Sequence, residues 1–411
     1  MELGRRAHPL QPAPGMSDSI GGIGRGIVCL AFIACHAPNA SSEIDPGSDA
    51  AIADQDDAAQ VNAEQDGAAP VDGYVGTGNK FGIGLVGPGD VLDWNLGADL
   101  VGPGGYVRVV LPGITRTTQN PEAAWVAAVQ AIYDRGLVPV VRLAPPWGDT
   151  DVRNDSDDAA HLHYQALAAA HRRVVEGLPR RDGLPLWVEV HNEPNLCYEW
   201  TCHAGEGVGG SLSYATTAHE YAALLRDVAD AVHAIGDPRI GVMNAGLAPG
   251  GAASCQCGGD GGEPGVTSLA FLTEMKAAVP DVFARIDGFA SHAYPAQGEG
   301  WGFFVPYDQA GPGLHWFTRE LEIVAHALPV FLTETGWTTG AGATRAQIAD
   351  WTVAAYRDVW LPDPRIAAVM PFMLRDPAWD AFGWASPTGT HYPVYDAVRA
   401  VRCETIPGGC P

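Results

Sequence analysis

From residue 80 onward, short apolar runs alternate with amphipathic helical patterns, and this alternation leaves few possible folds. The runs are continuously apolar rather than alternating, as expected of parallel strands covered on both faces. We expect eight strands, at residues 81–86, 106–111, 138–143, 186–191, 240–244, 286–291, 329–333 and 367–373. Helical patterns lie between them, at residues 121–135, 157–178, 217–235, 267–279, 314–328 and 344–359.

Strands joined by helices in this order favour an α/β fold, and eight of them favour a (β/α)8 TIM barrel. Asn120 with Pro121 is a typical start for the first of these helices, and Ser156 is a typical start for the second. The connection at residues 91–100 is short and carries no clear helical pattern. A doubly wound open sheet is the alternative, because a strand count does not show that a sheet closes.

The sequence before residue 80 has a different character. Residues 36–79 carry nine acidic residues, no Lys or Arg and one aromatic residue, Tyr74. Such a segment cannot offset the entropy of ordering by burial, so we expect a disordered acidic tether. Residues 26–34 form an apolar run that is too short to span a membrane but suits the core of an export signal.

The end of that run, at Ala34 and Cys35, resembles the cleavage site of a bacterial lipoprotein, which would place a lipid anchor on Cys35. An ordinary cleaved signal and a buried apolar segment are the other interpretations. Either form of export signal predicts a cell-surface or secreted protein. The chain thus divides into an export signal (1–35), the tether (36–79), a folded domain (80–402) and a C-terminal tail (403–411).

Cysteine content agrees with export, because an even number of cysteines remains after the signal and favours disulfides. Cys403 and Cys410 are near neighbours and could pin the C-terminal end. The other four, which could pair or form a zinc site with an unusual spacing, are Cys197, Cys202, Cys255 and Cys257. The formal net charge of −24 excludes a nucleic-acid partner, which would need clustered positive charge.

Two of the expected strands end in a glutamate. The motif VHNEPN places Glu193 at the end of the fourth strand, and LTETGW places Glu334 at the end of the seventh. A carboxylate at the end of an apolar strand is costly unless it is paired or used. Catalytic groups of (β/α)8 barrels lie at this end of the strands, and paired carboxylates are what glycoside hydrolysis requires.

Asn192-Glu193-Pro194 and Thr333 to Trp337 resemble the acid/base and nucleophile motifs of clan A glycoside hydrolases, such as the cellulase-like family 5 and family 39. This resemblance implies a retaining O-glycosyl hydrolase on a (β/α)8 barrel, with Glu193 as acid/base and Glu334 as nucleophile. It also implies that Asn192 binds the sugar 2-hydroxyl and that Arg108 lies near the nucleophile. His292 and Tyr294 match a His-x-Tyr element of these enzymes.

Each of these residues also has a structural interpretation. A single strand-end glutamate can be a cap or an ion-pair partner, Arg108 an interior ion pair, and His292 and Tyr294 core groups. On the catalytic interpretation, Arg108 and a hydrogen bond from Tyr294 keep Glu334 ionised while Glu193 holds the proton. This chemistry needs no metal or other cofactor.

Tryptophans that follow strands suggest a cleft for several sugars, which favours endo action on a β-linked polysaccharide or oligosaccharide. These residues are Trp147, Trp200, Trp301, Trp337, Trp379 and Trp384. Trp379 or Trp384 could be the platform beneath the sugar that is cleaved. We expect a monomer with a carbohydrate substrate. A catalytically silent carbohydrate-binding barrel and a surface adhesion protein remain alternatives.

Overall fold

Strands and helices alternate along the chain in the computed structural model. It describes residues 77–146, 152–200, 214–249, 267–296, 305–407 and 410, which all belong to one compact unit. The predicted export signal with Cys35, and the tether apart from its last three residues, lie outside the described residues. So do Trp147, Trp301 and three of the four cysteines considered for zinc.

The eight expected strands are all present, and each pairs in parallel with its neighbours. They are β1 (Gly82–Gly84), β2 (Tyr106–Pro112), β3 (Val138–Ala144), β4 (Leu186–Val190), β5 (Ile240–Met243), β6 (Phe289–Ser291), β7 (Val330–Leu332) and β8 (Ile366–Val369). They form a five-stranded sheet in the order β1 to β5 and a three-stranded sheet in the order β6 to β8. The predicted α/β class with parallel strands is therefore confirmed.

The two sheets approach each other at both edges. Phe81, just before β1, forms a single parallel bridge with Val369 in β8, and Met243 in β5 forms another with Gly288, just before β6. A cluster of buried side chains draws on strands of both sheets. Its members are Tyr106, Val138, Val140, Trp187, Met243, Ala290, Phe331, Ala368 and Met370. Every strand from β2 to β8 therefore contributes at least one side chain to this shared interior.

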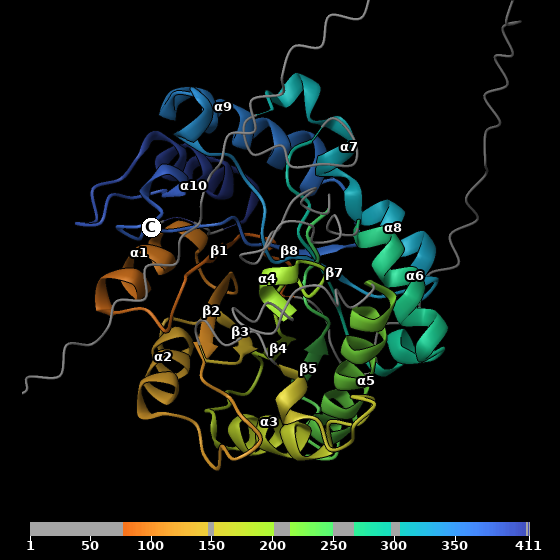
Figure 1. Ribbon diagram of the computed structural model, residues 1–411. Helices are drawn as coiled ribbons and strands as arrows, with labels where there is room; N and C mark the ends of the chain where they lie inside the picture. Colours follow the sequence, from red (N-terminus) through yellow and green to blue (C-terminus); the bar gives the residue numbers. More distant parts are fainter. Residues whose placement is uncertain are drawn as a thin grey trace, which may run out of the picture. The chain divides into compact units, whose positions relative to one another are not determined.

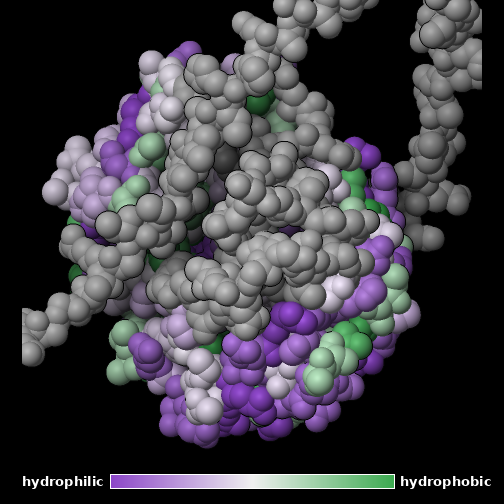
Figure 2. Space-filling view, viewed as in Figure 1, coloured by the Kyte–Doolittle hydropathy of each residue, from purple (hydrophilic) through white to green (hydrophobic). Residues whose placement is uncertain are grey.

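The helices lie around the outside of the strands (Figure 1), and a second, larger apolar cluster fills the space between the two layers. They are α1 (Val91–Val101), α2 (Ala123–Asp134), α3 (Gln165–Gly177), α4 (Cys197–Trp200), α5 (Tyr214–His233), α6 (Ser268–Ala278), α7 (Gly311–Leu314), α8 (Trp316–Val324), α9 (Arg345–Ala355) and α10 (Pro393–Thr405). None of the helices in the described ranges has the length and apolar character needed to cross a bilayer. Over α3, the surface in Figure 2 is mainly hydrophilic.

Several helix boundaries differ from the expected ones. The connection at 91–100 is a regular helix, α1, which a capping box of Asp90 and Asp93 starts. The N-cap of α2 is Glu122 rather than Asn120, and α3 begins at Gln165 rather than near Ser156. The single helix expected at 314–328 is divided into α7 and α8, and α9 continues into a π-helical turn at Tyr356–Trp360.

A disulfide fixes the C-terminal end of the chain, and two lysine side chains fix loops through hydrogen bonds to backbone carbonyl oxygens. A disulfide joins Cys403 and Cys410, one of the pairings that the sequence left open, and α10 runs to Thr405, past the expected domain end at 402. The ammonium group of Lys80 donates to the carbonyl oxygens of Leu361 (2.9 Å) and Asp363 (2.6 Å). That of Lys276 donates to the carbonyl oxygen of Ile323 at the end of α8, at 2.8 Å.

Candidate active site

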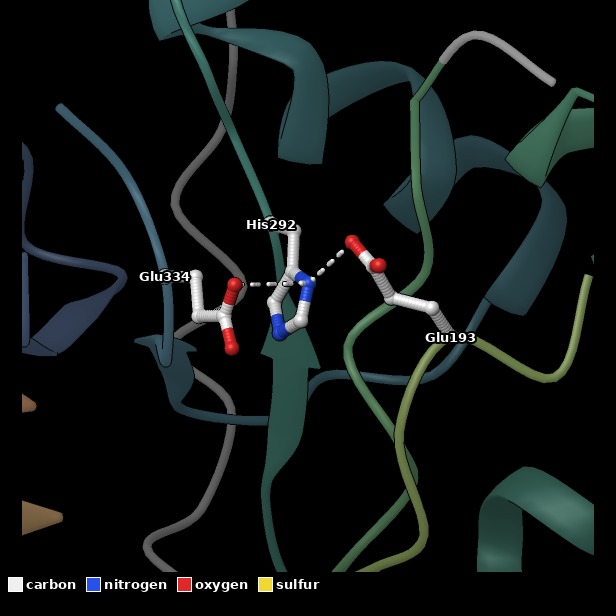
Figure 3. Close-up of side chains that lie close together, drawn as sticks. All are labelled: Glu193, His292 and Glu334. Carbon is white, nitrogen blue, oxygen red and sulfur yellow. Dashed lines mark hydrogen bonds and ion pairs between the residues drawn. The ribbon is translucent and has the colours of Figure 1, made fainter. Parts of the chain in front are cut away.

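Two buried carboxyl groups lie at the carboxyl ends of the strands. Glu193 follows β4 by three residues and Glu334 follows β7 by two, and their exposed fractions are 7% and 8%. Figure 3 shows the two side chains on either side of His292. Oxygen atoms of the two carboxyl groups lie within 4.8 Å of each other. The fold therefore brings together the two glutamates that the sequence singled out.

Glu334 is surrounded by hydrogen-bond donors and positive charge. Arg108 Nη1 donates to its Oε1 and the Tyr294 hydroxyl donates to its Oε2, each at 2.9 Å. Nη1 of Arg142, in β3, lies 3.9 Å from Oε1. Burial alone would raise the pKa of Glu334, but the charges of His292 and Arg108 outweigh it and hold the pKa below its usual value. The predicted contacts of Arg108 and Tyr294 with Glu334 are present.

Glu193 has a different environment. Burial raises the pKa of its carboxyl group above the usual value, although a hydrogen bond from His292 opposes this shift. Nδ1 of His292 lies 2.8 Å from Glu193 Oε1. The Glu193 backbone has a positive φ of 34°, and its N–H donates to the carbonyl oxygen of Gly246 at 3.1 Å. Glu193 is therefore the carboxyl group that holds a proton more readily.

His292 is fully buried between the carboxyl groups, and its Nδ1 lies 3.8 Å from Glu334 Oε2. Burial alone would lower its pKa, but the charge of Glu334, the nearby carboxylate of Glu189 and the hydrogen bond with Glu193 raise the pKa to about 10. The imidazole is thus a cation at neutral pH. Its ring fits against Gly246, where a Cβ atom would lie 2.1 Å from His292 Cδ2.

Asn192 is buried beside Glu193, and its Nδ2 donates to Glu199 Oε1 in α4 at 3.1 Å. Burial raises the pKa of Glu199 to about 7, against the opposing charge of Arg142. The backbone N–H of Asn192 donates to His191 Nδ1 at 2.7 Å. The amide group of Asn192 can donate a second hydrogen bond, so contact with Glu199 leaves it able to bind a ligand.

The predicted aromatic cleft is largely not found among the described residues. Trp200, Trp337 and Trp384 are buried at 0%, 2% and 2% exposure and belong to the core. Nε1 of Trp337 donates to the carbonyl oxygen of Val305 at 2.7 Å. A position after a strand does not fix the direction of a side chain, and these rings point into the apolar layer. Trp337 and Trp384 pack within the described core, and the prediction that they bind substrate stays a prediction.

Trp379 differs from those three because it is partly exposed. Its ring lies edge to face with Phe372 at a centroid distance of 5.5 Å, and Phe382 lies 6.3 Å away. Phe372, also partly exposed, follows β8 by three residues. Trp379 and Phe372 thus form an apolar surface at the end of β8. The sequence pattern pointed to Trp379 but not to Phe372.

The geometry of Glu193, His292 and Glu334 would also allow a metal ion, since their ligand atoms lie within 4.8 Å of one another. The chemistry fits poorly, because a metal ion would have to displace the proton that His292 holds strongly between two carboxyl groups. Arg108 and Tyr294 already donate to Glu334, and the nearby cations would repel a metal ion. These three residues are better suited to proton transfer.

Sequence reasoning missed three charged residues of the site, namely Arg142, Glu189 and Glu199. Arg142 and Glu189 each interrupt an apolar strand, and a charge inside a strand that is buried on both faces was a usable signal. The two residues are partners in the register of β3 and β4. Glu199 lies in a short helix that had no pattern to mark it.

No family model and no curated protein matches the sequence. The structure is similar to a monomeric β-xylosidase from Caulobacter crescentus CB15, with TM-score 0.52, 19% identity, and 80% of this chain and 69% of that chain covered. It is also similar to a glucosidase from Croceicoccus marinus, with TM-score 0.52, 15% identity, and coverage of 79% and 67%.

A family 39 glycoside hydrolase from the gut symbiont Bacteroides cellulosilyticus WH2 matches with TM-score 0.49 and 17% identity. The match covers 78% of this chain but 63% of that enzyme, so the chain spans less than two thirds of its length. At these identities the similarity shows the fold. The chain has the α/β fold of the Caulobacter β-xylosidase and the Croceicoccus glucosidase, as the resemblance to glycoside hydrolases led us to expect.

Proposed function

We propose that the protein is a retaining glycoside hydrolase of clan A that cleaves β-linked oligosaccharides or polysaccharides. The observation that carries this proposal is the pair Glu193 and Glu334, whose oxygens lie within 4.8 Å and whose pKa values shift in opposite directions. Retaining enzymes hold their carboxyl groups about 5 to 5.5 Å apart, whereas inverting enzymes leave about 6.5 to 9.5 Å for a water molecule.

We also propose that the two sheets form one closed (β/α)8 barrel. The bridges at both edges and the interior cluster drawn from both sheets support closure. In a closed barrel, the ends of β4 and β7 face each other across the opening, which places the two glutamates on opposite sides of a bound sugar.

In the proposed mechanism, ionised Glu334 attacks the anomeric carbon while Glu193 donates its proton to the leaving oxygen. Arg108 and Tyr294 hold Glu334 as a carboxylate in the resting site. Once the glycosyl ester forms, Glu334 loses its charge, so the pKa of Glu193 falls and Glu193 can take a proton from the attacking water. The second step releases the sugar with its original anomeric configuration.

For substrate binding, we propose that Asn192 contacts the sugar 2-hydroxyl through its second amide hydrogen. Trp379, together with Phe372, would provide the apolar platform. Endo action on a polymer is also part of the proposal, and its support rests on the tryptophans that follow strands, of which Trp200, Trp337 and Trp384 are buried. Substrates should include xylosides and glucosides, which the names of two structural neighbours indicate.

The proposed roles predict two different rescue products. With an aryl glycoside that has a good leaving group, Glu334→Ala should lose hydrolysis and regain turnover with azide to give a glycosyl azide of inverted configuration. Glu193→Ala should give an azide product of retained configuration, because the nucleophile is still present. Product configuration is read by NMR. A retained product from Glu334→Ala would contradict the assignment.

The alternative of a catalytically silent barrel is tested with the wild-type protein. Release of reducing sugar from β-glucan, mannan and xylan should accompany cleavage of aryl glycosides. Binding to a glycan without turnover on any of these substrates would favour the silent barrel, and neither binding nor turnover would favour an adhesion role.

We further propose that the protein is exported and monomeric, anchored through a lipid on Cys35 or secreted after ordinary cleavage. The short apolar run that ends at Cys35 and the acidic segment behind it support this proposal.

A further inference from the structure

A third carboxylate lies beneath the two glutamates of the proposed mechanism. Glu189 is in β4, four residues before Glu193, and its exposed fraction is 0%. Its Oε2 accepts a hydrogen bond from Arg108 Nε at 2.5 Å. Its Oε1 accepts from Thr333 Oγ1 at 2.8 Å and from the Gly246 N–H at 3.3 Å. Groups from β2 and from the ends of β5 and β7 therefore converge on one side chain.

His292 approaches the same carboxylate from the end of β6. Its Nε2 lies 3.8 Å from Glu189 Oε1, while its Nδ1 lies 2.8 Å from Glu193 Oε1. The imidazolium thus lies between a buried anion on one side and the proposed acid/base on the other. Arg108 is placed in the same way, with Nε on Glu189 and Nη1 on Glu334.

We propose that Glu189 is a positioning residue that couples the two halves of the active site. Through Arg108 it orients the guanidinium that faces the nucleophile, and through His292 it orients the imidazolium that faces the acid/base. The proposal rests on the proposed function for its catalytic meaning. Glu189 is buried beneath the site and touches these two cations, so it acts through them.

The charges around Glu189 make its own charge necessary. Arg108 and His292 are two buried cations, and Glu189 with Glu334 supplies the two anions that balance them. Arg142, its register partner in β3, adds further positive charge. Groups that interact with His292 are Glu189, Glu193, Glu334, Tyr294 and Glu320. Without the charge of Glu189, His292 should hold its proton less strongly.

The first test follows the His292 imidazole by NMR in the full-length protein as pH is raised. Glu189→Gln keeps the shape of the side chain and removes its charge. The midpoint of the His292 titration should fall by about one pH unit or more in this variant, the usual size of a shift caused by a neighbouring charge. Glu189→Asp keeps the charge on a shorter side chain and should leave the midpoint closer to that of the wild type.

The matched control is Glu220→Gln. Glu220 is also a buried carboxylate with a cationic partner, Arg153 at 3.0 Å, and it accepts a hydrogen bond from Trp200 Nε1 at 3.1 Å. Its substitution should reduce resistance to unfolding by urea and leave the His292 midpoint unchanged. If Glu189 were merely structural, Glu189→Gln would behave like this control.

The second test measures kinetics on an aryl glycoside. In Glu189→Gln, kcat should fall on the order of 10²-fold with little change in KM, because the groups around the nucleophile lose alignment. The acid limb of kcat/KM should move to lower pH, because the charge of Glu189 raises the pKa of Glu334 in the wild type. Glu189→Asp should recover part of the loss.

An unchanged His292 midpoint in Glu189→Gln, or a variant with wild-type kcat, would overturn the proposal. If Glu189→Gln fails to fold, Glu189→Asp decides. The shorter side chain lengthens the contact with Arg108, so a wild-type kcat in that variant would count against positioning. Absence of hydrolysis by the wild-type protein would instead contradict the proposed function. The NMR titration needs no substrate, so the two failures are distinguishable.

Discussion

At the scale of single residues, Glu193 and Glu334 have the same side chain but hold a proton with different strength. Burial acts on both carboxyl groups and by itself would raise the pKa of each. The difference comes from the charge of Arg108, which lowers the pKa of Glu334, and from the hydrogen bonds that Arg108 and Tyr294 donate to Glu334. The neighbours of each carboxyl group, rather than its depth, therefore assign the proposed roles.

A pH profile should show this difference. In the wild type, kcat/KM should fall at low pH as Glu334 gains a proton and at high pH as Glu193 loses one. The charge of His292 lowers both pKa values, so His292→Gln should move both limbs of the profile to higher pH. His171→Gln, at another buried histidine that contacts the carbonyl oxygen of Leu167, is the control and should move neither. Opposite movement of the limbs would argue against the assignment.

Gly246 offers a second test at this scale. A Cβ atom there would collide with the His292 ring, so Gly246→Ala should displace the imidazole and lower kcat on the order of 10²-fold. Gly87→Ala is the matched control, because a Cβ at Gly87 would meet no atom within 4 Å. Equal activities of the two variants would show that the position of His292 does not matter.

Glu193 and Glu334 could be predicted because a polar residue at the end of an apolar strand marks the chemically active end of the fold. The other residues were predicted from the resemblance to clan A motifs, namely Asn192, Arg108, His292 and Tyr294. Glu189 and Arg142 were missed because the pattern that identified their strands treats every position as apolar. The directions of Trp337 and Trp384 could not be predicted, because residues after a strand have no fixed periodicity. The placement of these four side chains depends on contacts between segments that lie far apart in the chain.

At the scale of elements, the strands were easier to predict than the helices. Strands that are buried on both faces form mainly apolar runs, and all eight were predicted within a few residues. Helix α1 was not predicted because it is mainly apolar, so its polar and apolar residues show little helical periodicity. The start of α3 was misplaced because Ser156 instead bonds within its loop, to His161 Nδ1 at 2.7 Å. A residue that can cap a helix therefore predicts a helix start only where its side chain is not already hydrogen-bonded within a turn.

The contact between β1 and β8 is an element-scale feature that can be tested. A Cβ at Gly82 would lie 2.5 Å from Met370 Cγ and 2.9 Å from the carbonyl oxygen of Val369. Gly82→Ala should therefore force the two strands apart and lower the free energy of unfolding by about 1 to 3 kcal/mol.

Hydrogen exchange should also become faster in β1 and β8 of this variant, while β3 and β4 change less. Gly87→Ala again serves as the control. An unchanged free energy of unfolding in Gly82→Ala would argue that the two strands do not close tightly against each other.

At the scale of the whole molecule, the proposed export of the chain depends on residues outside the described structure. The full chain, expressed in a bacterium that lipidates exported proteins, should be found in the membrane fraction and incorporate labelled fatty acid. Cys35→Ser should release it to the soluble fraction, because the acylated side chain is lost. Cys29→Ser, within the same apolar run, should stay in the membrane fraction. Membrane association that survives Cys35→Ser would contradict a lipid anchor.

The placement of the two lysines has a practical consequence. Lys80 and Lys276 are the lysines of this chain, and both ammonium groups donate to backbone carbonyl oxygens. A nitrogen engaged in this way is a poor nucleophile, so amine-directed cross-linkers and resins should react slowly with the folded domain. Immobilisation or labelling of the native protein should therefore be directed to carboxyl groups, which are abundant on its surface.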